Sequence, residues 1–539
     1  KVKRVKPPSR RKDCGLLKLC LRPAFAPGSA TVYSAEDLDL MGYYALADLA
    51  NITVGYSTYQ LFGERVFETR GLKAGSFENN KHLLAIDGIP INHLRAGKAQ
   101  TEFSLPLYFA DRVSFIRGPL SSLWGQNAFF GMVDIRSKRP TRRGFSGGAM
   151  ATYQYGFPEH GFRLMANGFH ASRVTATTLN LGLYLKGSSR DEVGVNPAHL
   201  NFDRQTSIFA RLHHRFVDGA LRGLSAGLIF MRKNGGLGEF WAAYSSELNS
   251  LTWQTIVPYL RYSGVVSRRL SIDTFVRGNF SKERGSYLRD AATGDMSEYD
   301  IQLFGMHTVS EMRYRVTRMT SLLLGLDYEL RMSRNLLAEK LGEIVQKDSE
   351  LQHLFSGYAQ LRTRLRFLSG MHLLAEVRYG IGRSPGNDAQ HLTYRLGVVQ
   401  RLLAGLAIKL TYATGNRPPS LKEVDLNWEA RQALEKKSVS TDLIQDLRAE
   451  RIESFAASLL FGYRGLRLDL TYFYNRVTDA LSAVNYSGEF FFRNNAGQTR
   501  AAGLSLEVRA RLPFKLGVLA NFSYATAVNE DGFEVADVP

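Results

Sequence analysis

The chain has 539 residues and carries 69 Lys and Arg against 50 Asp and Glu, a formal net charge of +19 at pH 7. With 44% hydrophobic and 22% charged residues, it is neither a disordered polyampholyte nor a chain unable to form a core. Its mean hydropathy is −0.19, and its longest apolar runs fall well short of the roughly 18 residues that a spanning helix needs, which excludes a helical membrane protein. A membrane β-barrel is not excluded, because its strands alternate apolar and polar residues.

Residues 1–30 are predicted to form a basic N-terminal arm. The opening KVKRVKPPSRRK has seven basic residues and no acidic residue, a charge run typical of disordered tails. Cys14 and Cys20 are too few for a disulfide framework and lack zinc-site spacing; they either pair or remain two thiols. The apolar segment around them resembles a weak signal-peptide core that Lys18 interrupts.

Residues 31–140 are predicted to form a small mixed α/β domain. Ser34 as N-cap, with Asp37 three positions on, predicts a helix that runs to about Ala50. Compact apolar segments punctuated by glycine then predict short strands, and the domain ends near Pro140.

From Gly144 onward the hydrophobic period changes to two. Even positions in 322–332 and 466–474 are Leu, Tyr or Met, while the odd positions include many charged and polar residues. About eighteen such segments occur, many of them longer than the five or six residues usual in soluble strands. Aromatic residues gather toward their ends, as in the girdles of membrane barrels. A soluble sandwich is the alternative, but it explains less well the charged faces of so many long strands.

The connections between these segments alternate in length. Short turns are interleaved with long polar loops, as expected when a barrel has short turns on the periplasmic side and long loops outside. The fold class is therefore membrane all-β, a large antiparallel transmembrane β-barrel with an N-terminal α/β domain; a lumen able to hold that domain needs about 22 strands. The long loops are expected at 186–203, 234–252, 282–299, 334–351 and 414–451.

No known catalytic or cofactor motif is present in the sequence. It contains no P-loop, His-Glu-x-x-His pair, nucleophile elbow or Cys-x-x-Cys, so we expect no enzyme, no cofactor and no metal site. The basic residues alternate along strands instead of forming one contiguous patch, so no nucleic acid is expected as a partner. Lipopolysaccharide phosphates and outer-membrane lipid, or an anionic cargo in the lumen, are the alternatives.

An ordered set of motifs resembles TonB-dependent outer-membrane receptors, the family of siderophore, haem and cobalamin receptors. The resemblance implies a plug domain at 31–140 inside a barrel at 144–539, in the bacterial cell outer membrane, working as a monomer with the TonB energy-transducing protein. Family barrels end on an aromatic strand, so we expect this chain to be C-terminally incomplete, with about 18 of 22 strands. No recognisable TonB box precedes Thr31. The motifs are AIDGIPIN at 85–92, RVSFIRGP at 112–119, SSLWG at 121–125, GMVDI at 131–135, NRPPSL at 416–421, LRAER at 447–451 and YFYN at 472–475.

The resemblance also implies a set of contacts between plug and barrel. Arg70 and Arg117 would be buried in the plug and would need carboxylate partners. Family barrels typically carry glutamates at the positions that correspond to Ala456 and Ser505, so the usual lock on these arginines is expected to differ here. The candidate partners are Glu450, Glu453 and Glu507.

The implied function is the import of a scarce metal chelate, by binding at loops and plug followed by energy-driven plug rearrangement. We favour a ferric siderophore; the cargo would carry iron, or cobalt if it were cobalamin. The 417–450 segment has no His, which lowers haem relative to a siderophore. The alternatives are a cobalamin or haem receptor and a barrel-anchored adhesin. Basic and aromatic candidates for ligand contact, which suit an anionic aromatic chelate, are Tyr56, Tyr59, Phe77, His93, Arg95, Lys98, Trp241, Tyr244, Tyr287, Arg289 and Trp428.

Overall fold

The computed structural model describes residues 29–530, except 62–63, 74–77, 156–159, 188–204, 237–249, 291–294, 341–342, 348–349, 367–369, 385–386, 496 and 514–515. The predicted basic arm, with both cysteines, lies outside the described residues apart from its last two positions, which begin strand β1. None of the helices in the described ranges is long and apolar enough to cross a membrane.

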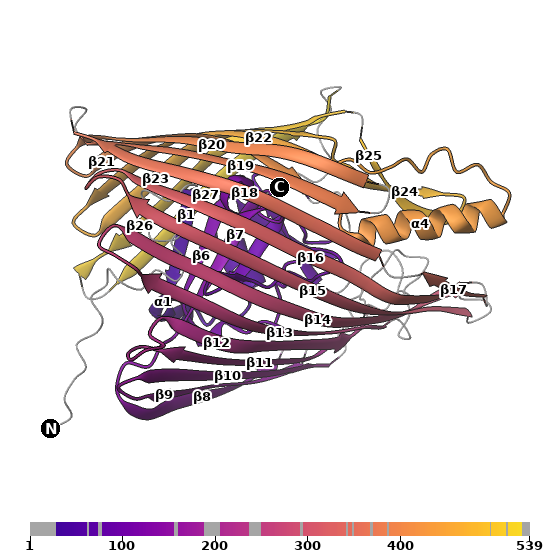
Figure 1. The fold of residues 1–539 in the computed structure, drawn as a ribbon, viewed down its shortest axis with the longest axis horizontal. Coiled ribbons are helices and arrows are strands. Elements are labelled where there is room, and N and C mark those ends of the chain that lie inside the picture. Colours follow the sequence, from indigo (N-terminus) through magenta and orange to yellow (C-terminus); the bar gives the residue numbers. More distant parts are fainter. Residues whose placement is uncertain are drawn as a thin grey trace.

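An N-terminal α/β unit, which we call the plug, is surrounded by the tilted strands of a large sheet (Figure 1). Its central sheet has the order β1-β6-β7-β4-β5, in which β4 and β7 run parallel and the other pairs run antiparallel. The hairpin β2–β3 stands apart from this sheet. The plug elements are β1 (Ser29–Ser34), α1 (Ala35–Met41), α2 (Leu46–Asn51), β2 (Tyr56–Leu61), β3 (Glu64–Thr69), β4 (His82–Ile86), β5 (Ile89–Pro90), η3 (Leu107–Phe109), β6 (Ala110–Arg117), α3 (Ser121–Trp124) and β7 (Gly131–Ser137).

The plug is helical at its start, as predicted, but the single helix expected to reach Ala50 is wrong. Ser34 caps α1 through a capping box with Asp37. The helix then ends because Gly42 adopts a left-handed conformation, φ 68°, and its N–H bonds back to Leu38. A second helix, α2, begins only at Leu46.

The large sheet has 17 long antiparallel strands, close to the predicted number, with β17 as a short addition against β16. The strand order brings the last strand, β27, back beside the first, β8. No residue register joins these two among the described residues, so the sheet is not closed there. The strands are β8 (Gly144–Tyr155), β9 (His160–Ala171), β10 (Thr175–Lys186), β11 (Gln205–Phe216), β12 (Leu224–Gly235), β13 (Ser250–Val265), β14 (Leu270–Asp290), β15 (Asp295–Arg315), β16 (Ser321–Lys340), β17 (Glu343–Lys347), β18 (Glu350–Leu365), β19 (Met371–Ser384), β20 (Asn387–Leu403), β21 (Leu406–Arg417), β22 (Glu450–Tyr463), β23 (Leu466–Thr478), β26 (Thr499–Arg511) and β27 (Gly517–Val528).

The period-two pattern separates an outer apolar face from an inner polar one, as predicted. In β16, Leu324 and Leu326 are 40% and 58% exposed, while Asp327, Glu329 and Arg331 on the other face are buried. In β23, Leu470 and Tyr472 point outward and Thr471 is buried. Successive side chains of a strand alternate between its two faces, so one face meets lipid and the other meets the plug.

Two of the expected long loops are instead extended strands. Strands β14 and β15 cover most of 282–299, and β16 and β17 cover most of 334–351, because neighbouring strands continue to satisfy each other's backbone groups beyond the lipid-facing part. The expected loop at 414–451 contains helix α4 (Leu421–Lys436). Helix α4, β17 and the hairpin β24 (Leu481–Tyr486) and β25 (Glu489–Asn494) lie at one end of the sheet, opposite the short turns (Figure 1). We call this end the external end.

Candidate functional site

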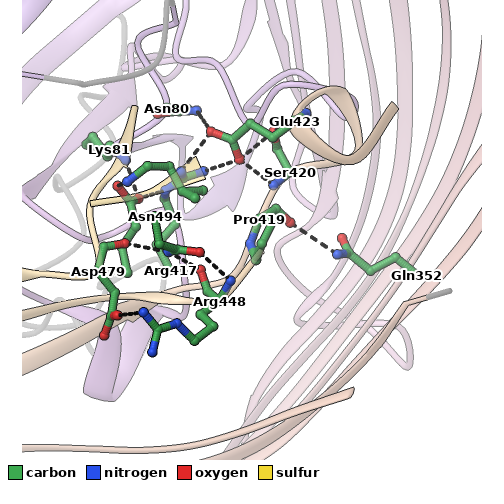
Figure 2. Close-up of polar contacts among 12 residues, drawn as sticks. Asn80, Lys81, Gln352, Arg417, Pro419, Ser420, Glu423, Arg448, Asp479 and Asn494 are labelled. Carbon is green, nitrogen blue, oxygen red and sulfur yellow. Dashed lines mark hydrogen bonds and ion pairs between the residues drawn. The ribbon is translucent and has the colours of Figure 1, made fainter. Parts of the chain in front are cut away.

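A buried cluster of four charged side chains joins the plug to the barrel wall and to α4 (Figure 2). Arg417 of β21 donates to Glu423 of α4 at 2.8 and 3.1 Å, and its Nε donates to Glu450 of β22. Lys81 of the plug forms an ion pair with the same Glu450. All four side chains are about 2% exposed or less, so each charge depends on its partners.

The local sequence explains how α4 comes to this cluster. Pro418 and Pro419 follow Arg417 and end β21, because proline cannot donate a ladder hydrogen bond. Ser420 then caps the helix: it accepts from the Glu423 backbone N–H, and Glu423 accepts from Ser420 N at 2.7 Å. Glu423 therefore serves both as helix cap and as ion-pair partner. The sequence signal for this helix is the Ser-x-x-Glu pattern at 420–423, within the segment predicted to be a long loop.

Neighbouring contacts fix the backbone around the cluster (Figure 2). Gln352 donates to the Pro419 carbonyl at 3.3 Å. Arg448 pairs with Asp479 at 2.8 Å and is held through its backbone by Asn494. The NRPPSL and LRAER motifs, separate in sequence, thus meet at one place.

A second group of ion pairs lies at the loop of the plug between β5 and η3. Arg95 bonds Asp425 of α4 at 3.1 Å and Glu283 of β14 at 3.4 Å. Burial alone would lower the pKa of the Arg95 guanidinium, but these two carboxylates raise it above its ordinary value. The Lys422 N–H also donates to the Arg95 carbonyl at 3.1 Å. This loop is therefore attached to α4 by backbone and side chain alike.

Lys98 belongs to the same loop, and its charge is neutralised by a carboxylate of the plug itself. It pairs with Glu64 of β3, which also accepts from Lys233 of β12 at 2.7 Å. Burial tends to raise the pKa of the Glu64 carboxyl, yet the two ammonium groups lower it to about 2. Glu78 adds a further bridge, because Lys422 of α4 bonds to it.

A third contact lies at the turn between β4 and β5. Asp87 and Gly88 take positive φ, 50° and 83°, as a tight Asp-Gly turn between two strands requires. The Asp87 carboxylate accepts from Arg211 of β11 at 2.5 Å, and its carbonyl accepts from Arg261 of β13 at 2.7 Å. The turn is thus also a docking point for the barrel wall.

Comparison with known proteins identifies the architecture. The family described as "TonB dependent receptor-like, beta-barrel" matches residues 177–539, more than half of the chain, and the "TonB-dependent Receptor Plug Domain" matches residues 23–132. The chain is a TonB-dependent receptor. Proteins of this family are receptors and transporters of the bacterial outer membrane, not enzymes.

Individual relatives are distant. The ferrichrome outer membrane transporter/phage receptor of Escherichia coli (strain K12) is 24% identical over 180 residues, 32% of this chain and 23% of that protein, so the match spans about a quarter of the relative. The ferric yersiniabactin uptake receptor of Yersinia pestis has a TM-score of 0.72 at 14% identity, covering 95% of this chain and 82% of that one. The copper transporter OprC has a TM-score of 0.72 at 12% identity, covering 95% and 80%. These two structural matches show a shared fold and leave the cargo open.

In this TonB-dependent receptor, the plug arginines Arg70 and Arg117 have different contacts. Arg117 donates to Thr31 at 2.8 Å and to the Val54 carbonyl at 2.9 Å, and Thr31 in turn donates to Glu507 of β26. Glu507 therefore reaches Arg117 through a hydroxyl. Arg70 instead lies over the ring of Phe473, 4.8 Å from its centre.

Arg70 has no carboxylate within ion-pair distance among the described residues, so the prediction that Glu450, Glu453 or Glu507 pairs with it is wrong. Burial, and then the charge of Arg117, lower the pKa of its guanidinium to about 9. A buried cation of this kind costs free energy that a cation–π contact offsets only in part.

We therefore expect Arg70→Met to leave the plug as stable or to stabilise it by about 1 kcal/mol, because an apolar chain of similar length replaces an unneutralised charge. Urea unfolding of the detergent-solubilised receptor, followed by protease sensitivity of the plug, measures the change. Phe473→Leu is the paired variant, expected to destabilise the plug when Arg70 is present. A loss of more than about 2 kcal/mol on Arg70→Met would show instead that the charge is well compensated.

The prediction that Glu453 contacts the plug is wrong. Its side chain is 53% exposed and its ion-pair partner, Arg476 at 4.0 Å, is on the neighbouring strand. The pleat explains the difference, since Glu450 and Glu453 are an odd number of positions apart and must face opposite sides of β22.

The structure separates the predicted ligand residues into several places. Tyr56 is not at an apex: it is 7% exposed in the plug core, against Phe67, His82 and Phe115. Tyr59 is half-buried in β2, with Lys73 over its ring. His93, Arg95 and Lys98 lie together at the external end, where His93 Nε2 is 3.6 Å from Glu283. Trp428 is half-buried in α4. Phe77, Trp241 and Tyr244, and the side chains of Tyr287 and Arg289, lie outside the described part of the chain.

The acidic half of the site was not predicted. The predicted ligand contacts were cations and aromatics suited to an anionic ligand, whereas Arg95 and Lys98 at the external end already face carboxylates. These carboxylates come from β3, the segment between β3 and β4, β14 and α4, which are far apart in the chain, so only the cap residue Glu423 carries a local signal. They are Glu64, Glu78, Glu283, Glu423 and Asp425.

Proposed function

We propose that this receptor imports a scarce metal chelate across the outer membrane, and that the chelate is a ferric siderophore. The cargo binds at the external loops and plug, and energy delivered by TonB then rearranges the plug. The observation that carries the proposal is the direct attachment of an external helix, α4, to the plug through Arg95, Asp425 and Lys422. A ligand that contacts α4 therefore acts on contacts that hold the plug.

The charge arrangement constrains how the cargo binds. Arg95 and Lys98 are paired with buried carboxylates, so an anionic chelate that uses them must exchange places with those carboxylates. This exchange offers a physical link between cargo binding and loosening of the plug. The partners in this proposal are TonB, outer-membrane lipid and lipopolysaccharide, with the receptor as a monomer.

Growth experiments test the cargo. A strain that lacks the gene is grown under iron limitation with a panel of ferric siderophores and with haem, and separately with cobalamin as the limiting nutrient. We expect growth on one siderophore to be lost and to return with the wild-type gene. A defect on haem or cobalamin alone assigns the receptor to that cargo, and no defect on any cargo favours the barrel-anchored adhesin.

Binding to purified receptor tests the role of α4. We expect Trp428→Ala to weaken binding of the chelate that supports growth about tenfold, which corresponds to about 1.4 kcal/mol, because an aromatic face on the external helix is removed. The matched control is Tyr463→Ala, which removes an aromatic side chain at the opposite end of the barrel, where Tyr463 is 56% exposed. Equal binding by both variants and the wild type would contradict a ligand site at α4.

A further inference from the structure

A cavity of about 510 Å³ lies in the barrel wall and lumen at the end with the short turns, far along the strands from α4. Its lining comes from β18, β19, β20, β21 and the turn between β15 and β16. The volume falls within the usual range for small-molecule sites. None of the external-end residues described above contributes to it.

The lining is strongly basic. Six of its side chains are cationic or can become so, and among the described lining residues none is acidic. Arg364 and Arg366 are exposed at the mouth, whereas Lys409 is 4% exposed at the inner side. The six are Arg318, Arg362, Arg364, Arg366, His372 and Lys409.

Two carboxylates lie close to the lining: the charge of Glu376 acts on Arg362 and Arg395, and that of Asp469 acts on Lys409. Glu376 accepts from Ser122 at 2.8 Å and from Gln360 at 2.7 Å, and Asp469 accepts from Thr471 at 2.8 Å. Both reduce the local charge, but two carboxylates do not balance the four arginines of the lining. The potential in the cavity is therefore positive, and low-dielectric walls strengthen it.

The basic region also continues inward to the plug. Thr411 lines both this cavity and a void of about 10 Å³ that is bounded by Arg70, Arg117 and Arg395. Within the described residues, Arg395 Nε and Nη1 have no hydrogen-bond partner. Basic side chains thus line the path from the short-turn end to the plug arginines, with Glu376 and Asp469 beside them.

We propose that this cavity binds a small multivalent anion that carries carboxylate or phosphate groups. Arginines at the mouth offer paired N–H donors that match both groups. Two sources share this chemistry: a free anion of the periplasm, or the acidic groups of a chelate that passes the plug. The second source rests on the proposed function; the first does not.

Isothermal titration of the detergent-solubilised, full-length receptor with citrate and with pyrophosphate tests the site. The cavity variant is Arg364→Gln with Arg366→Gln, and the matched control is Arg222→Gln with Arg269→Gln, two exposed arginines in other short turns of the same end. We expect both probes to bind the wild type and the control equally, and the cavity variant at least tenfold more weakly. Absence of binding to the wild type, or equal weakening in both variants, would overturn the proposal.

A competition arm separates the two sources. The chelate that supports growth is added to receptor saturated with pyrophosphate. Displacement of pyrophosphate from both the wild type and the control identifies the chelate as an occupant, whereas probe binding without displacement identifies a free anion. Failure of the uptake proposal leaves the probe titration intact, so the two proposals fail independently.

Discussion

Replacement of Glu450 by Gln is expected to destabilise the plug by about 3 to 5 kcal/mol, the usual cost of removing one partner from a buried ion pair. Glu450 is the carboxylate that Lys81 and Arg417 share, and its Oε1 also accepts from the Leu481 N–H at 2.9 Å. Arg417 retains Glu423, but Lys81 loses its ion-pair partner.

The size of this loss of stability depends on the protonation of Lys81. Burial, and then the charge of Arg417, already lower the pKa of the Lys81 ammonium to about 8. Without Glu450 this pKa falls further, so Lys81 loses its proton near neutral pH and part of the penalty is relieved. We therefore expect the loss to be larger at pH 6 than at pH 8.

Urea titration of the solubilised receptor, with protease sensitivity of the plug as readout, measures the effect. Glu453→Gln is the matched control: it makes the same chemical change three positions along the same strand, at an exposed side chain. It is expected to change stability by less than about 0.5 kcal/mol. Equal effects of the two variants would refute the assignment of Glu450 as the link between plug and barrel.

Mild acid is expected to loosen the plug through His82. This side chain is 0% exposed, its Nε2 is 2.6 Å from the Thr69 hydroxyl, and the rings of Tyr56 and Phe67 surround it. Burial lowers the pKa of the imidazole from 6.5 to about 3. In the folded plug it is therefore neutral at any physiological pH.

The sign of the pH effect follows from the protons bound in each state. Between pH 3 and 6.5 the unfolded chain protonates His82 and the folded plug does not, so stability falls as the pH falls below 6.5. At pH 5 the loss from this group is about 2 kcal/mol, and it approaches about 5 kcal/mol near pH 3. Above pH 6.5 the contribution is constant.

Unfolding measured from pH 8 to pH 5 for wild type and His82→Phe tests this assignment. We expect the variant to be about 1 kcal/mol less stable than the wild type at pH 8, because the hydrogen bond to Thr69 is gone. Because the variant lacks most of the slope, this deficit should disappear and reverse by pH 5. His93 is also buried, and burial lowers the pKa of its imidazole. His93 therefore contributes the pH dependence of stability that remains in the variant. A variant with the full wild-type slope would mean that His82 is not the titrating group.

Local sequence patterns predicted the fold well wherever a single physical rule determines the structure. The two-residue period of β16 and β23 predicted which side chains face lipid, because the pleat forces alternation. The same parity, applied to Glu450 and Glu453, would have corrected the prediction for Glu453. The Ser-x-x-Glu pattern at 420–423 likewise contained the start of α4, and the left-handed Gly42 ended the first helix early.

The site was less predictable, because its chemistry comes from pairs that are remote in sequence. Lys81 and Glu450 are 369 positions apart, and Arg95 and Asp425 are 330 apart. Neither partner of such a pair carries a local signal of the other. The predicted ligand contacts His93, Arg95 and Lys98 lie together at the external end, but no local signal pointed to the carboxylates that pair with Arg95 and Lys98.

The sequence alone determined a membrane barrel with a plug, since alternation of side chains and the order of the motifs depend only on neighbours along the chain. The tertiary structure decided which charges meet, that α4 is tied to the plug, and that basic groups from several strands surround one cavity. The physical reason is the same in each case. A buried ion pair or charge cluster has a large effect on stability, and these side chains become buried only when distant strands come together in the fold.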